Sequence, residues 1–138
     1  MWAFLSRNPS IGQLMLRVGL GGLFIYLYGW EKLAGGIDTW RNVGKAMSHL
    51  GVHFWYPFWG FLATMVESIG MLLFVIGFAF RPACLLITFN LIVAAVVSYH
   101  GDAKTGSGLH AAGHPLELAI VFFAMTFIGP GKYSVDRQ

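Results

Sequence analysis

The sequence predicts an all-α integral membrane protein, a four-helix bundle with a short interfacial helix between the first and second membrane helices. Of its 138 residues, 57% are hydrophobic and only 11% are charged. The apolar residues occur in four long runs, and a helix needs about 20 apolar residues to cross a bilayer. We therefore expect a single transmembrane domain over residues 1–138, with spans at about residues 11–32, 57–80, 82–100 and 114–130.

The first run, IGQLMLRVGLGGLFIYLYGW, contains one charge, Arg17. An arginine precedes this run, as it does in a signal peptide. However, the run is longer than a signal sequence requires and shows no small-residue cleavage pattern. We expect it to be a retained first membrane helix.

The connection after the first run has the pattern of an amphipathic helix. Its apolar residues recur at helical spacing and its charged residues fall on the opposite face, as expected for a helix that lies on the membrane surface. The apolar residues are Ile37, Trp40, Val43, Met47 and Leu50, and the charged ones are Asp38, Arg41 and Lys45.

The three later runs differ in length and in the charges they contain. The second run contains Glu67, and the third follows it after the short turn at Arg81 and Pro82. The fourth is short for a span, so either it begins earlier, around Ser107, or its polar start lies at membrane depth. Pro115 suits the first turn of a helix, which favours a start near residue 114.

Four spans place both termini on one side of the membrane. Lys and Arg are equally numerous on the two sides, and their density in the shorter segments favours cytoplasmic termini. The net charge is +3, but the nine Lys and Arg residues are scattered and form no basic run, so nucleic acid is not an expected partner.

Several ionisable residues lie inside the predicted spans, where each needs a partner or a purpose because its burial in lipid is costly. From the helical rise of about 1.5 Å per residue, Glu67, Glu117 and His114 lie at one level, about 20 Å from the terminal side. We expect Arg17 to reach toward Glu67 from one side and His100 to close the group from the other. The candidate ligand-binding residues are Glu67, Glu117, His114, His100, Arg17 and Lys32.

Four interpretations of this group remain open. The first is an internal network that holds the helices together, and the second is a site for a quinone headgroup or small polar ligand. The third is a metal site, and the fourth is a proton path. The metal site would use His100, His114, Glu117 and Glu67, since His and carboxylate ligands suit first-row transition metals. The spacing lacks the paired Glu-x-x-His motif of di-iron bundles.

Three segments resemble the DoxX family of small bacterial membrane proteins. They are LRVGLGGLFIYLYGWEKLAGG with Arg17 and Lys32, ESIGMLLFVIGFAFRPA with Glu67 and Arg81, and the closing GPGKYSVD. The resemblance implies a four-helix bundle in the bacterial plasma (inner) membrane. Some relatives are the small membrane subunit of thiosulfate:quinone oxidoreductase, and others are linked to quinone resistance or thiol redox balance through soluble partners.

The combined expectation is a redox-associated membrane protein that binds a quinone or a transition metal, with the bilayer and a soluble oxidoreductase as partners. Whether it catalyses a reaction stays open, and an accessory subunit is favoured over a stand-alone enzyme. One alternative is a non-catalytic scaffold or assembly factor that recruits a soluble partner. Another is a small-solute or proton transporter, which would require a homo-oligomer because four helices leave little room for a path.

Overall fold

The computed structural model describes residues 8–101 and 108–136, and the regular elements of this part are helices. Within it, four helices are long and apolar enough to cross a membrane. They are Pro9–Ala34, Tyr56–Ile76, Phe80–Tyr99 and Leu109–Ile128. The predicted all-α membrane bundle is therefore confirmed. Residues 102–107, which connect the third and fourth predicted spans, lie outside the described part.

The first span is one continuous helix that includes two wider π-type turns. Pro9 stands in its first turn, where the missing backbone N–H costs nothing. Arg17 lies in the first of the π-type turns, a feature common at functional or strained positions. The segments are α1 (Pro9–Met15), η2 (Leu16–Leu20), α2 (Gly21–Phe24), η3 (Ile25–Gly29) and α3 (Trp30–Ala34).

The second span consists of α5 (Tyr56–Met65), the π-type turn η5 (Val66–Gly70) and α6 (Met71–Ile76). It ends four residues earlier than the predicted limit at residue 80. Gly77 adopts a left-handed conformation with φ 74°, which terminates the helix as a glycine cap does. The chain then turns directly into α7 (Phe80–Tyr99).

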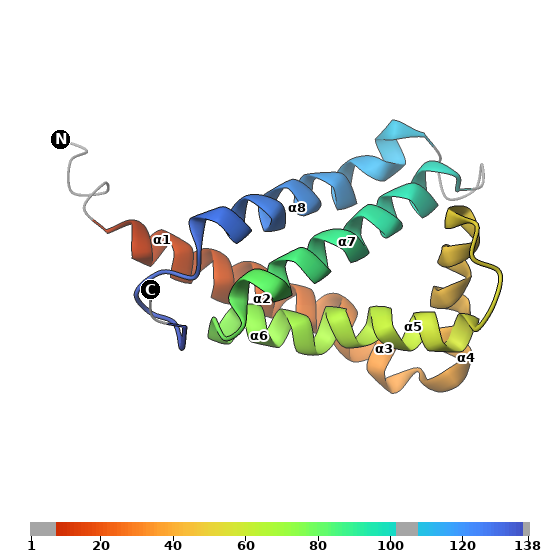
Figure 1. Ribbon diagram of the computed structural model, residues 1–138, viewed down its shortest axis with the longest axis horizontal. Helices are drawn as coiled ribbons and strands as arrows, with labels where there is room; N and C mark the ends of the chain where they lie inside the picture. The colour runs from red at the N-terminus through yellow and green to blue at the C-terminus, as the bar shows by residue number, and fades with distance from the viewer. Residues whose placement is uncertain (1–7, 102–107, 137–138) are drawn as a thin grey trace.

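The predicted amphipathic helix between the first two spans is present as α4 (Gly36–Gly44), followed by the 3₁₀ segment η4 (Lys45–Leu50). Figure 1 shows these segments, in orange to yellow, across the end of the bundle opposite α1. Helix α4 packs very closely on α5, since a Cβ atom on Gly60 would lie 1.6 Å from the Trp40 carbonyl oxygen. Only glycine permits this approach.

Helix α8 (Leu109–Ile128) begins earlier than the predicted residue 114, close to the alternative start around Ser107. Pro115 therefore lies inside the helix and not in its first turn. It removes one backbone hydrogen bond, which a membrane helix tolerates where its neighbours are helices.

The core forms where α6, α7 and α8 meet, and α7 and α8 lie side by side in Figure 1. The ring of Phe74 stacks on Phe80 at a centroid distance of 5.2 Å and meets Phe122 edge-on at 4.9 Å. Met71 and Ile87 belong to the same cluster and are fully buried. In lipid such packing supplies much of the association between helices, because apolar burial alone gives no advantage.

Candidate functional site

Three polar side chains from three spans meet in a hydrogen-bonded triad inside the bundle. The Lys32 ammonium donates to Glu67 Oε2 at 2.5 Å, forming an ion pair. The Asn90 amide nitrogen donates to Glu67 Oε1 at 2.8 Å. Both carboxylate oxygens are thus satisfied, as a buried charge requires. We call Lys32, Glu67 and Asn90 the polar triad.

Close contact between the first and second spans positions the triad. A Cβ atom on Gly29 would lie 3.4 Å from the Glu67 carbonyl oxygen, so the missing side chain lets the two helices meet there. Ser68 Oγ donates to the Gly29 carbonyl at 3.3 Å across the same contact. On the other side of Lys32, the Trp40 indole donates to the Lys32 carbonyl at 3.2 Å, which ties α4 to the end of the first span.

The polar triad lines a cavity of about 910 Å³, which we call the central cavity. This volume lies in the usual range for small-molecule sites. The cavity is bounded by η4 and the end of α4 on one side and by the second span and α7 on the other. Its walls are mostly apolar, including Leu62, Val66, Leu86 and Val93.

The charges of the triad largely cancel. Lys32 and Glu67 form a contact pair whose side chains are only 28% and 10% exposed. A contact ion pair presents a dipole to the cavity and not a net charge, so a charged ligand gains little from it. The Lys32 ammonium has three N–H donors, of which Glu67 takes one, and the Asn90 side-chain oxygen accepts no hydrogen bond from a described residue.

Two histidines stack beside the central cavity. His49 lines the cavity from η4, and its ring lies 5.6 Å from that of His100 at the end of α7, with an interplanar angle of 21°. His100 Nδ1 lies 2.9 Å from the Val96 carbonyl oxygen, which fixes the imidazole orientation. His100, a predicted ligand, therefore lies beside His49 and is not a member of the triad.

Arg17 is placed differently from the expectation that it would neutralise Glu67. Its guanidinium is 1% exposed and donates to four backbone carbonyls at 2.6 to 3.1 Å. Two of them, Phe74 and Val75, lie at the end of α6, where helical carbonyls lose their partners. The others, Pro130 and Tyr133, belong to the segment after α8. Arg17 therefore joins three parts of the chain.

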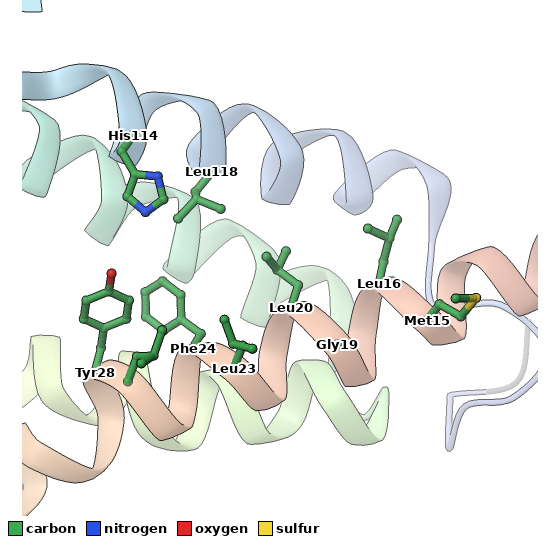
Figure 2. Close-up of a pocket in the computed structure, with 10 residues that line it drawn as sticks. Met15, Leu16, Gly19, Leu20, Leu23, Phe24, Tyr28, His114 and Leu118 are labelled. Carbon is green, nitrogen blue, oxygen red and sulfur yellow. The ribbon is translucent and has the colours of Figure 1, made fainter. Parts of the chain in front are cut away.

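The polar residues of α8 do not join Glu67 either. Glu117 is exposed on the outside of the bundle, and His114 borders a separate groove between the first span and α8. Figure 2 shows His114 and Tyr28 pointing into this groove from opposite sides. Among the described residues, no three His, Cys, Asp or Glu side chains are grouped to hold a metal ion, so the predicted set of His100, His114, Glu117 and Glu67 is not assembled.

Asn90 is the triad member that sequence reasoning did not propose as a ligand residue. It is a polar residue in the middle of the otherwise apolar run LLITFNLIVAAVV, a signal that marks a buried hydrogen-bonding position in a membrane helix.

Comparison with known proteins supports the fold. The DoxX family model matches residues 12–100, which include all three triad residues. The chain is 26% identical over 133 residues to the inner membrane protein YphA of Escherichia coli (strain K12), covering 91% of this chain and 88% of that protein. No solved structure matches. A four-helix membrane architecture and a family match over more than half of its length show that this chain belongs to the DoxX family.

Proposed function

We propose that this protein is an accessory membrane subunit of a redox system and binds a quinone headgroup in the central cavity. The observation that supports the proposal is the polar triad on the wall of an apolar cavity of about 910 Å³. A mostly apolar site with a few convergent polar groups is typical of small-molecule binding. The similarity to YphA, an inner membrane protein, favours the same membrane for this chain.

A quinone suits this chemistry better than an ion does. It is neutral, as expected for a site where Lys32 and Glu67 offset one another. Its carbonyl oxygen accepts a hydrogen bond from a remaining Lys32 N–H. The hydroxyl of the reduced quinol donates to the Asn90 side-chain oxygen, so the same site serves both redox forms.

The experiment is equilibrium binding of a short-chain benzoquinone to the purified protein in lipid nanodiscs, followed by tryptophan fluorescence. We expect saturable binding, weakened about tenfold or more by Lys32→Met, since a hydrogen bond from a charged donor contributes about 1.5–3 kcal/mol. Glu67→Gln removes the counter-charge that holds Lys32 in place and is expected to weaken binding as well.

Glu31→Gln is the matched control, because Glu31 is an exposed carboxylate next to Lys32 that no hydrogen bond or ion pair joins to a described residue. It should bind the quinone like the wild type. If the folded wild type shows no saturable binding, or if all three variants bind equally well, the quinone proposal is wrong. The scaffold and transporter alternatives are then preferred.

A further inference from the structure

Glu117 is a carboxylate on the outer surface of α8, close to the middle of the membrane. It follows Leu109 by eight residues and precedes Ile128 by eleven, which places it about 12 Å and 16 Å from the two helix ends. Its face of the helix is opposite the face of the buried residues Ala119 and Phe122. A carboxylate that faces lipid at this depth is costly, and such residues usually face another protein segment.

No other described residue satisfies Glu117 within one copy of the chain. Neither Glu117 nor His114, which lies one turn earlier on α8, forms a hydrogen bond or an ion pair with a described residue. The two side chains flank one face of the helix, and both are exposed. This face therefore carries one acid and one base, separated by about 4.5 Å along the axis.

We propose that two copies of the chain associate through this face of α8, with Glu117 of each copy paired to His114 of the other. In a dimer whose two-fold axis follows the membrane normal, the two α8 helices are parallel and equal levels meet. Because the two residues flank the face, the two-fold axis places each carboxylate across from the imidazole of the other copy, and the side chains span the offset of about 4.5 Å, giving two equivalent pairs. Such a self-complementary face is what a symmetric interface requires.

Small residues on the same face allow the helices to approach. Gly113 and Ala124 lie four residues before and seven residues after Glu117, so all three share one side of α8. A Cβ atom on Gly113 would meet nothing within 4 Å, which shows that this side is open. Small residues of this kind let membrane helices pack at short distance.

The groove between the first span and α8 adjoins this face. It has a volume of about 570 Å³ and is lined almost entirely by apolar side chains, among them Leu16, Leu23 and Leu118. In Figure 2, His114 and Leu118 border it from α8. The groove gives apolar side chains of the second copy a place to pack beside the two charge pairs.

The first test measures dimerisation of fluorescently labelled protein in liposomes by energy transfer. We expect the wild type to dimerise and Glu117→Ala or His114→Ala to dimerise roughly threefold to thirtyfold more weakly, the range set by polar contacts between membrane helices. The double variant His114→Glu with Glu117→His restores the pairing and should recover dimerisation. Glu31→Ala is the control and should behave like the wild type.

Cysteine cross-linking locates the interface. Ala124→Cys lies on the proposed face, four residues before the end of α8, and we expect it to form a disulfide-linked dimer. Leu72→Cys is a matched control, exposed and four residues before the end of α6. The wild type gives the baseline because its Cys84 is buried.

A monomeric wild type, dimerisation unaffected by Glu117→Ala, or equal cross-linking at residues 72 and 124 would each overturn the proposal. A wild type that remains monomeric points instead to lipid chains in the groove. The dimer is independent of quinone binding, because none of its residues lines the central cavity.

Discussion

Glu67 and Arg17 show two ways in which single residues keep a charge inside a membrane protein. Glu67 is held by one charged and one neutral side-chain donor, Lys32 and Asn90, beside a cavity. Among the described residues, the hydrogen-bond partners of the Arg17 side chain are backbone carbonyls at the other end of the bundle. The partners of Glu67 therefore have groups that can also form hydrogen bonds with a ligand. The carbonyls around Arg17 instead make it a residue that holds parts of the chain together.

The coupling between Lys32 and Glu67 is measurable as a thermodynamic cycle. Removing one partner of a buried ion pair leaves the other charge unpaired, so Glu67→Gln and Lys32→Met should each destabilise the protein by about 2–3 kcal/mol. The double variant should cost less than the sum of the two, by about 1 kcal/mol or more. Thermal unfolding in detergent measures the stability of each variant. If the loss in the double variant equalled the sum of the two single losses, Lys32 and Glu67 would not be coupled.

Arg17→Lys should destabilise the protein by about 3 kcal/mol or more. The planar guanidinium reaches four carbonyls in different directions, and a single ammonium cannot replace it, so several charge-assisted hydrogen bonds of about 1.5–3 kcal/mol are affected.

The control for this change is Arg41→Lys. Arg41 forms an exposed pair with Asp38, and a surface pair contributes little, so the expected loss is about 0.5 kcal/mol or less. The midpoint of thermal unfolding distinguishes the two. Equal stability of Arg17→Lys and the wild type would contradict the anchoring role of Arg17.

At the level of helices, glycines decide which elements touch. Gly29, Gly44 and Gly60 lie where backbones meet, and a Cβ on Gly44 would lie 1.7 Å from the Tyr56 carbonyl oxygen. In contrast, Gly19 and Gly22 of the first span face open surface. The contact between α4 and α5 matters most for the proposed quinone site, because α4 and η4 close one side of the central cavity.

Gly60→Ala should therefore separate α4 from α5, lower the stability of the protein and weaken the proposed binding of quinone. Gly19→Ala, in a helix and with nothing within 4 Å of the added methyl group, should be neutral or should stabilise by up to about 1 kcal/mol. Unfolding midpoints and quinone titrations of both variants check the contrast. If Gly19→Ala lowered the stability and Gly60→Ala did not, the conclusion that Gly60 and not Gly19 lies at a close helix contact would be wrong.

The sequence predicted the helices better than the partners of their polar residues. Long apolar runs and helical spacing suffice for four spans and for α4, since these patterns are local. The end of the second span at Gly77 depends on a left-handed backbone, which the run FVIGFAF does not reveal. The partners of Glu67 depend on how three helices are rotated about their own axes. Residue counts give the depth of a residue along its helix but not this rotation.

The expected site was therefore only partly assembled. Glu67 and Lys32 were both among the candidate ligand residues, and the structure brings them together with Asn90. His114 and Glu117 were predicted at about the depth of Glu67, but both are exposed, and the described partners of Glu67 are Lys32 and Asn90. Their ligand-binding roles, and those of Arg17 and His100, stay predictions.

At the scale of the whole molecule, the bundle has two distinct ends. The end near α1 and the segment after α8 is closed by Arg17 and the aromatic cluster of Phe74, Phe80 and Phe122. The other end is crossed by α4 and η4 (Figure 1). This end contains the central cavity. The architecture thus combines a packed end that stabilises the fold with a hollow end suited to a ligand.

The most direct test of the quinone site is photoaffinity labelling with an azido-benzoquinone, followed by peptide mapping. We expect the label on residues that line the central cavity, in η4, α5 and α7. An excess of unlabelled quinone should prevent this labelling, and Lys32→Met should reduce it. Labelling confined to the groove between the first span and α8, at residues such as Tyr28 and Leu118, would contradict it.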